Sequence, residues 1–230
     1  MVVYSHKKYK IKMAKKKNKI PNFHPTVHVI AATILFFISV VVSRQSAMLP
    51  WEETLFLSIY NWPDFLRPFF IFVTWFGEIQ ILGILALVFV FMKKTQAVIR
   101  LLMVSTMAYL LSGIGKSIWG RTRPNELLSE VVARGFSYGP GFPSGHTALA
   151  VAMALVVGHY LPKKYHWVVV AWIVGVALSR VYLGVHAPLD IVGGFAIGWF
   201  SYMMLRHVRL YPVKFGKRKK TNKVAYTKGR

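Results

Sequence analysis

Six long apolar runs constrain the fold of this 230-residue chain more than any other feature of its sequence. Each run is long enough, or nearly so, to cross about 30 Å of hydrocarbon as a helix. Inside a bilayer, a helix satisfies its own backbone hydrogen bonds. The sequence therefore predicts an all-α polytopic membrane protein, with six transmembrane helices in a bundle. The expected spans are residues 27–45, 70–92, 97–115, 144–161, 167–185 and 188–205.

The connection between the first two spans carries three prolines and two tryptophans. We expect its segment 55–66 to lie along the membrane interface as an amphipathic helix. Trp51 and Trp62 would then lie at the depth of the lipid head groups, where amphipathic aromatic rings are enriched.

Basic residues are concentrated at the chain ends and in two predicted turns. Eight lysines precede residue 26 and ten Lys or Arg lie from Arg206 onward, with no acidic residue in either segment. The turns at 93–100 and 163–164 hold five more. Because cytoplasmic segments carry the excess of Lys and Arg, this pattern predicts an even number of spans and two cytoplasmic termini. The expected organisation is a basic tail (1–26), a six-helix domain (27–205) and a second basic tail (206–230).

The formal charge of +23 does not by itself indicate a nucleic-acid-binding protein. The basic residues lie on short, low-complexity tails, without the folded surface and aromatic platforms of such proteins. We interpret the tails as anchors beside anionic lipid, and expect no nucleic-acid partner. The chain has no cysteine, which excludes disulfides and thiolate metal sites. No signal peptide is apparent, because the first apolar run is too long for one and no small-residue cleavage site follows it.

Polar residues that interrupt the apolar pattern gather in three clusters, at 116–124, 142–146 and 179–190. Ionisable groups close to a span are costly, so they generally have a partner or a function. In the six-span topology, all three clusters lie at the same outer face of the membrane. The sequence therefore predicts one polar site there.

The clusters contain groups that suit a tetrahedral dianion such as phosphate. Lys116, Arg123 and Arg180 supply three positive charges, and a guanidinium group can hold two phosphate oxygens at once. Ser144 and Gly145 stand at a predicted helix start behind a proline, where free N–H groups favour an anion.

Two histidines remain for bond and proton chemistry. His186 and Asp190 are four residues apart and would share a face of a helix, so the carboxylate could hold one ring N–H and leave the other nitrogen free to attack. His146 would be free to protonate a leaving oxygen. Taken singly, each cluster has another interpretation: interfacial basic residues, a turn before a helix, or half of a metal site. A zinc site would need three or four close ligands, and only these two histidines and Asp190 are available.

Together the three clusters resemble the signature of the type 2 phosphatidic acid phosphatase superfamily. That signature is Lys, six residues, Arg-Pro; then Pro-Ser-Gly-His; then Ser-Arg, five residues, His, three residues, Asp. Every position is filled here between residues 116 and 190. The resemblance implies a metal-independent lipid phosphatase with no cofactor.

The resemblance also implies a role for each position. His186 is similar to the nucleophile that forms a phosphohistidine, Asp190 to its orienting partner, and His146 to the general acid that then activates water. The phosphate ligands that it implies are Lys116, Arg123, Ser144, Gly145 and Arg180. The positions that it implies to be structural are Pro124, Pro143 and Ser179.

The expected substrate is a phosphorylated membrane lipid in a bacterial plasma membrane, met at an active site that faces outside. The resemblance implies undecaprenyl pyrophosphate, phosphatidylglycerol phosphate, phosphatidic acid or diacylglycerol pyrophosphate. We expect undecaprenyl pyrophosphate first, because an outward site would meet that product of wall synthesis. Phosphatidylglycerol phosphate is the next candidate, because nothing in the sequence separates an isoprenoid from a diacyl tail.

Two functions of other classes stay open. A lipid transporter or scramblase would bind phosphate without cleaving it, although it would not need two histidines and an aspartate. An interaction protein would use the basic tails to recruit partners. Gly77, Glu78 and Tyr182 are interpreted either as lining a lipid entrance or as packing residues. The remaining histidines receive no role; they are His6, His24, His28, His159, His166 and His207.

Overall fold

A computed structural model of the protein describes residues 25–44 and 47–206. Within these residues the chain is helical and contains no strand, so the predicted all-α fold is confirmed. The α-helices are α1 (Pro25–Ser43), α2 (Pro50–Tyr60), α3 (Arg67–Thr74), α4 (Ile79–Phe91), α5 (Thr95–Trp119), α6 (Pro124–Leu127), α7 (Gly145–Tyr160), α8 (His166–Tyr182) and α9 (Pro188–Leu205). The short 3-10 helices are η1 (Asp64–Leu66), η2 (Trp75–Gly77) and η3 (Lys163–Tyr165).

Among the described residues, four stretches are long and apolar enough to cross a membrane. They are Thr26–Ser43, Thr95–Leu127, Lys163–Tyr182 and Pro188–Leu205. The bent pair α3–α4 makes a fifth if it is counted as one span. Helix α7 is apolar but has only 16 residues, about 24 Å of helix, which is less than the hydrocarbon thickness. The protein is therefore a membrane protein with four or five candidate spans, and six full crossings stay a prediction.

The predicted second span, residues 70–92, is broken rather than straight. Glu78 has extended backbone angles, φ −100° and ψ 161°, and the axis bends by 60° between the two helical parts. The close approach of Gly77 to the start of α7 accompanies this break, since an added Cβ there would lie 2.8 Å from the carbonyl oxygen of His146. The break brings the Gly77–Glu78 backbone against α7, which a straight apolar helix would not do.

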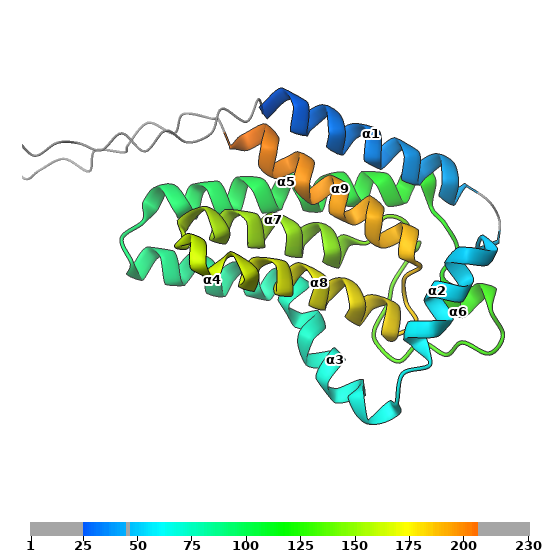
Figure 1. Ribbon diagram of the computed structural model, residues 1–230. Coiled ribbons are helices and arrows are strands. Elements are labelled where there is room, and N and C mark those ends of the chain that lie inside the picture. Colours follow the sequence, from blue (N-terminus) through cyan, green and yellow to red (C-terminus); the bar gives the residue numbers. More distant parts are fainter. Residues whose placement is uncertain (1–24, 45–46, 207–230) are drawn as a thin grey trace, which may run out of the picture.

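Helix α7 occupies the centre of the bundle, between α5, α8 and α9 (Figure 1). Nine of its side chains are buried, four of them alanines. On α9, a Cβ added to Gly198 would lie 2.5 Å from the carbonyl oxygen of Ala148, so the two backbones nearly touch. Small residues allow such close approach between membrane helices. The packing fixes the start of α9 beside the start of α7, where the second and third polar clusters lie.

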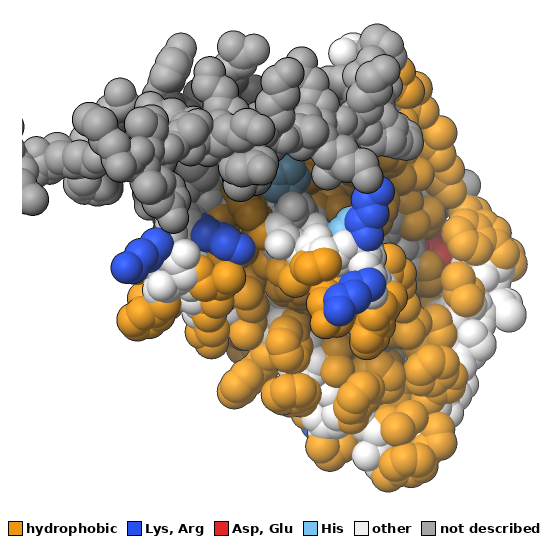
Figure 2. All heavy atoms as spheres, turned by 60° about the vertical axis from the view of Figure 1, so that its left-hand side comes forward, with side chains coloured by type: hydrophobic (Ala, Val, Ile, Leu, Met, Phe, Trp, Pro, Cys, Tyr) orange, Lys and Arg blue, Asp and Glu red, His pale blue; other side chains and the backbone are white. Residues whose placement is uncertain are grey.

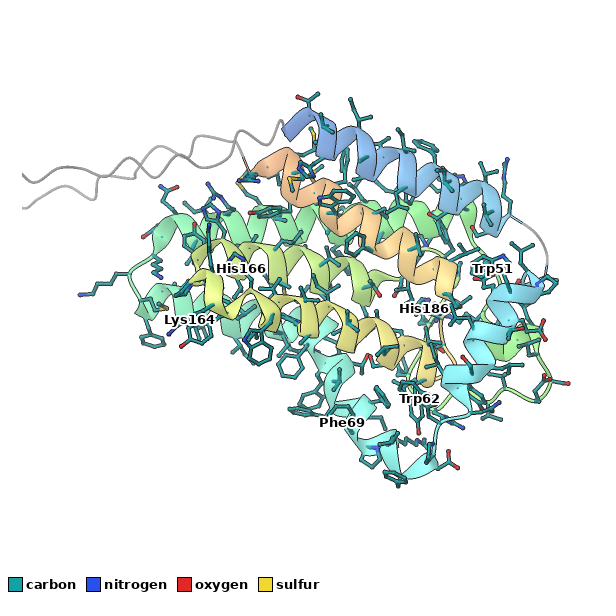
Figure 3. All side chains as sticks on the ribbon, viewed as in Figure 1. Trp51, Trp62, Phe69, Lys164, His166 and His186 are labelled. Atoms are coloured by element: carbon teal, nitrogen blue, oxygen red, sulfur yellow. The ribbon has the colours of Figure 1, made fainter. Side chains whose placement is uncertain are left out.

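The described bundle has two distinct ends. The start of α1, the end of α9 and the α4–α5 and α7–α8 turns lie at one end, whereas α2 and α6 lie at the other (Figure 1). Lys and Arg side chains lie at the first end, and apolar side chains cover much of the face seen in Figure 2. Lys164 and His166 lie at this basic end, and Trp51 and Trp62 lie at the opposite end, close to α2 (Figure 3).

The predicted tails lie almost wholly outside the described residues, which omit 1–24 and 207–230. The boundaries at 26/27 and 205/206, and the cytoplasmic position of both termini, therefore stay predictions.

Candidate active site

A cavity of about 1240 Å³ lies among α3, α4, α5, the start of α7 and the end of α8. It brings the three polar clusters together, and six of the eight predicted site residues line it. These six are Lys116, Arg123, Gly145, His146, Arg180 and His186. The other two, Ser144 and Asp190, are fully buried and do not line the cavity.

His186 lies in the short loop between α8 and α9, where Gly184 turns the chain with a φ of +74° (Figure 3). Its Nδ1 is 3.3 Å from Oδ2 of Asp190, and the same oxygen accepts a 2.9 Å hydrogen bond from the N–H of Ala187. The contact that the spacing predicted is present, but its geometry differs. His186 precedes the helix, and Asp190 reaches back from the first turn of α9 as part of an N-terminal cap.

The environment of His186 favours a neutral imidazole. Burial lowers the pKa of His186 well below its ordinary value of 6.5, and the nearby charges of Arg180 and Arg123 lower it further. Because the carboxylate of Asp190 accepts the proton on Nδ1, we assign the lone pair to Nε2. Nε2 is 3.5 Å from Nη1 of Arg123. The free nitrogen therefore lies beside a group that can hold an anion.

Carbonyl oxygens now occupy the donors of Arg123 and Lys116. Nε of Arg123 donates to Gly139 at 2.7 Å and Nη1 donates to Val185 at 2.5 Å. Nζ of Lys116 donates to the carbonyl of Pro140. These bonds hold the two side chains in place, and phosphate oxygens could replace the carbonyl oxygens as their acceptors.

Arg180, near the end of α8, supplies a third positive charge. Its Nη1 donates to Oγ1 of Thr74 at 3.0 Å and its Nη2 lies 3.4 Å from the carbonyl of Phe136. Nε of Arg180 is buried and makes no hydrogen bond within the described part of the chain. A phosphate oxygen would satisfy this donor.

Ser144 acts as the N-cap of α7 rather than as a cavity wall. Its Oγ accepts hydrogen bonds from the N–H and the hydroxyl of Thr147, at 3.4 and 3.0 Å. Its own N–H donates to the carbonyl of Asp190 at 2.9 Å. This cap holds the first turn of α7 so that Gly145 and His146 reach the cavity.

His146 faces the cavity and is paired with Glu78, Nε2 to Oε1, at 3.7 Å. Gly77 and Glu78 line the cavity, which agrees with the entrance interpretation. Tyr182 does not line it. Its ring packs against Phe70, and its hydroxyl donates to the carbonyl of Pro63, so it is a packing residue.

Two residues next to the site, Glu52 and Arg121, were not selected from the sequence. Both are buried, and they form a two-bond salt bridge with N–O distances of 2.7 and 2.8 Å. Arg121 also reaches Asp190 at 3.6 Å. The position of Arg121 in the first cluster was a signal. Nothing in the connection between the first two predicted spans distinguished Glu52 from its neighbour Glu53.

Among residues 25–44 and 47–206, no three His, Cys, Asp or Glu side chains lie close enough together to hold a metal ion. The donors that line the cavity are cationic or neutral, which suits an anion.

Comparison with known proteins places these features in a family. The model of the PAP2 superfamily matches residues 97–213, just over half of the chain. An undecaprenyl-diphosphatase of Sulfolobus acidocaldarius is 28% identical over 67% of this chain and 77% of its own length. Phosphatidylglycerophosphatase B of Bacillus subtilis is 30% identical over 50% of this chain and 60% of its own length.

Two crystal structures share the fold. Aquifex aeolicus LpxE superposes with a TM-score of 0.64, at 26% identity over 69% of this chain and 96% of that one. The PAP2-type phosphatidylglycerolphosphate phosphatase of Bacillus subtilis superposes with a TM-score of 0.67, at 23% identity over 78% and 94%. The apolar bundle and these relatives define a membrane lipid phosphatase, a hydrolase of lipid phosphates. The chain belongs to the PAP2 superfamily.

Proposed function

We propose that the protein hydrolyses a lipid phosphate or pyrophosphate by a metal-independent route, through a phosphohistidine on His186. The observation that carries this proposal is the arrangement around His186. Its Nδ1 faces the carboxylate of Asp190, and His186 lines a cavity together with Lys116, Arg123, Arg180 and a second histidine.

In the first step, Nε2 of His186 attacks phosphorus in line with the leaving oxygen. The phosphorus–oxygen bond to that group breaks, and the leaving oxygen takes a proton from Nε2 of His146. Lys116, Arg123 and Arg180 stabilise the charge on the equatorial oxygens. In the second step, His146 accepts a proton from water, the resulting hydroxide attacks the phosphohistidine, and phosphate leaves with Nε2 of His186 restored.

Asp190 orients the nucleophile throughout both steps. Its Oδ2 accepts the Nδ1 proton, which fixes the tautomer and stabilises the positive ring of the phosphohistidine. Glu78 lies 3.7 Å from Nε2 of His146, the nitrogen assigned to proton transfer, so the leaving oxygen would take the place of this carboxylate when substrate binds.

Undecaprenyl pyrophosphate is the substrate that we propose first. Arg67 and Arg134 line the same cavity as the three proposed phosphate-binding cations, and they could hold the second phosphate. The cavity also has an apolar wall of exposed side chains on α4 and α5, including Ile79 and Ile114, along which an isoprenoid chain could lie. An undecaprenyl-diphosphatase is among the relatives.

Phosphatidylglycerophosphate is the second candidate, supported by the relative from Bacillus subtilis and by the same apolar wall. Phosphatidic acid and diacylglycerol pyrophosphate present the same chemistry. A transporter of lipid phosphates remains the alternative from another class. A neutral, buried histidine oriented by a carboxylate favours catalysis, because binding an anion would favour a charged one.

We infer that the site faces the outside of the cell membrane. His186 lies near the end of the bundle that carries α2, whereas Lys164 lies at the opposite, basic end (Figure 3). Excess Lys and Arg on the cytoplasmic side supports this orientation. The basic tails 1–26 and 206–230 would then lie against the anionic lipids of the inner leaflet.

The test is phosphate release by purified protein in detergent with EDTA. Undecaprenyl pyrophosphate, phosphatidylglycerol phosphate and phosphatidic acid are compared. The variant is His186→Ala, and the matched control is His166→Ala at the basic end. We expect release that survives EDTA, is lost with His186→Ala and is unchanged with His166→Ala. No release from any of the three lipids would favour the transporter.

A further inference from the structure

A buried chain of charged groups extends from the catalytic loop to α2. His186 contacts Asp190, and Asp190 lies close to Arg121. Arg121 in turn forms a salt bridge with Glu52 on α2. Glu52 is fully buried and binds Arg121 through both carboxylate oxygens, at 2.7 and 2.8 Å. Its Oε1 also accepts the N–H of Leu189, in the first turn of α9, at 3.0 Å.

We propose that Glu52 and Arg121 are positioning residues that hold Asp190 in the state required by His186. This inference rests on the proposed function, in which His186 is the nucleophile. It gives a role in the site to α2, which lies outside the three motifs.

The two oxygens of Asp190 have different surroundings. Oδ2 accepts from His186 and from the N–H of Ala187. Oδ1 is buried without a hydrogen bond among the described residues, and its nearest charged atom is Nη1 of Arg121 at 3.6 Å. That separation is longer than a hydrogen bond, so Arg121 supplies charge without a direct bond.

Glu52 accounts for this separation. A guanidinium next to two carboxylates binds most strongly to the one that offers a two-bond geometry. Because Glu52 occupies both terminal nitrogens, Arg121 is held back from Asp190. Without the charge of Glu52, Arg121 would close on Oδ1, and the carboxylate would be shared between Arg121 and His186. Asp190 would then bind the Nδ1 proton of His186 less strongly, and the Nδ1–H tautomer would be less favoured.

A purely structural role is the other interpretation of the same contacts. The salt bridge joins α2 to the loop after α5, and the bond to Leu189 caps α9. Glu52→Gln separates the two roles, because the amide keeps the size of the side chain and an oxygen for the N–H of Leu189. It removes the charge and one of the two acceptor oxygens that restrain Arg121.

The experiment compares Glu52→Gln with the control Glu53→Gln, which makes the same chemical change one residue along. Turnover with undecaprenyl pyrophosphate in detergent is measured with thermal stability and with the ¹⁵N spectrum of His186, assigned by its loss in His186→Asn. For Glu52→Gln we expect kcat to fall about 10- to 100-fold, with KM little changed, and the Nδ1–H tautomer to lose population. Glu53→Gln should match the wild type.

The double variant Glu52→Gln/Arg121→Gln gives a second readout. It removes the competing cation, so we expect kcat to recover above that of Glu52→Gln alone. If the salt bridge is only structural, kcat of the double variant should be lower than that of Glu52→Gln, because the double variant loses more of the bridge. If Glu52→Gln does not fold, Arg121→Lys replaces it, since lysine keeps the charge but cannot be held by two bonds; the same tautomer change is then expected.

The positioning role would be overturned by an unchanged His186 tautomer and kcat in Glu52→Gln, or by a double variant less active than the single one. Absence of phosphate release by the wild-type protein would overturn the proposed function instead. In that case, the tautomer of His186 in wild type and Glu52→Gln would still decide whether Glu52 positions it.

Discussion

At the scale of single residues, the site depends on which groups are kept charged and which are kept neutral. Burial and neighbouring guanidinium groups keep His186 neutral, and Asp190 fixes the direction of its remaining proton. Lys116, Arg123 and Arg180 line the same cavity, and their present partners are mostly backbone carbonyls. A phosphate group can replace a neutral carbonyl without separating an ion pair, which lowers the cost of binding.

The pH dependence of turnover follows from the state of His186. Its pKa lies well below 6.5, so it stays unprotonated as the pH falls through that value. The proposed nucleophile is therefore not lost to protonation between about pH 8 and 6. We expect kcat/KM to hold over this interval, measured by phosphate release in buffers of constant ionic strength. A decline with a midpoint near 6.5 would contradict a neutral, buried nucleophile.

Arg134 provides a test of the substrate at the same scale. Its guanidinium stacks 4.0 Å from the centre of the Tyr60 ring and reaches the cavity near Arg67. If it holds a second phosphate, Arg134→Gln should lower kcat/KM for undecaprenyl pyrophosphate about tenfold or more. Hydrolysis of phosphatidic acid, which has one phosphate, should change little. An equal loss for both lipids would show that Arg134 acts through the fold.

At the scale of elements, α7 and α9 set the geometry of the site. Their close approach at Ala148 and Gly198 leaves no room for a side chain. The caps at their first turns, Ser144 and Asp190, are joined by the bond from Ser144 N–H to the Asp190 carbonyl. The distance between His146 and His186 therefore depends on the packing of α9 against α7 at Gly198.

A valine at Gly198 should test this dependence. We expect Gly198→Val to destabilise the protein by about 1–3 kcal/mol or more, because the branched side chain would force α9 away from α7. The matched control is Gly83→Val on α4, where an added Cβ meets nothing within 4 Å. Thermal unfolding in detergent would compare the two, and equal melting temperatures would contradict the close packing.

At the scale of the whole molecule, the basic turns and the cavity lie toward opposite ends of the bundle (Figure 1). Apolar side chains cover much of the face seen in Figure 2. This polarity is what a protein needs to stay in one orientation in a membrane.

The absence of cysteine permits a direct test of that orientation. Lys164→Cys places a single thiol at the basic end, and Glu130→Cys places one at an exposed position in the loop after α6. In intact cells, a membrane-impermeant maleimide should label Glu130→Cys. It should label Lys164→Cys only after the cells are permeabilised. The reverse pattern would place the active site inside.

Much of this arrangement was predictable from the sequence, because it depends on local patterns. The run 188–205 matches α9 residue for residue, since a proline starts the helix and a basic segment follows it. The three clusters could be assigned to one face from topology alone. The break at Glu78 was not predictable, because it depends on the contact of Gly77 with His146, almost seventy residues away. Glu52 was missed for the same reason, since its partner Arg121 is 69 residues further along.

The cavity wall on α4 and α5 has a kinetic consequence. Because exposed residues on the flanks, such as Leu110 and Ile118, form part of that wall, the cavity opens toward the lipid phase. The enzyme would then meet its substrate by lateral diffusion in two dimensions. Its saturation should depend on the mole fraction of substrate among the surrounding amphiphiles rather than on the bulk concentration. Diluting a fixed amount of substrate lipid with inert detergent should therefore slow the reaction.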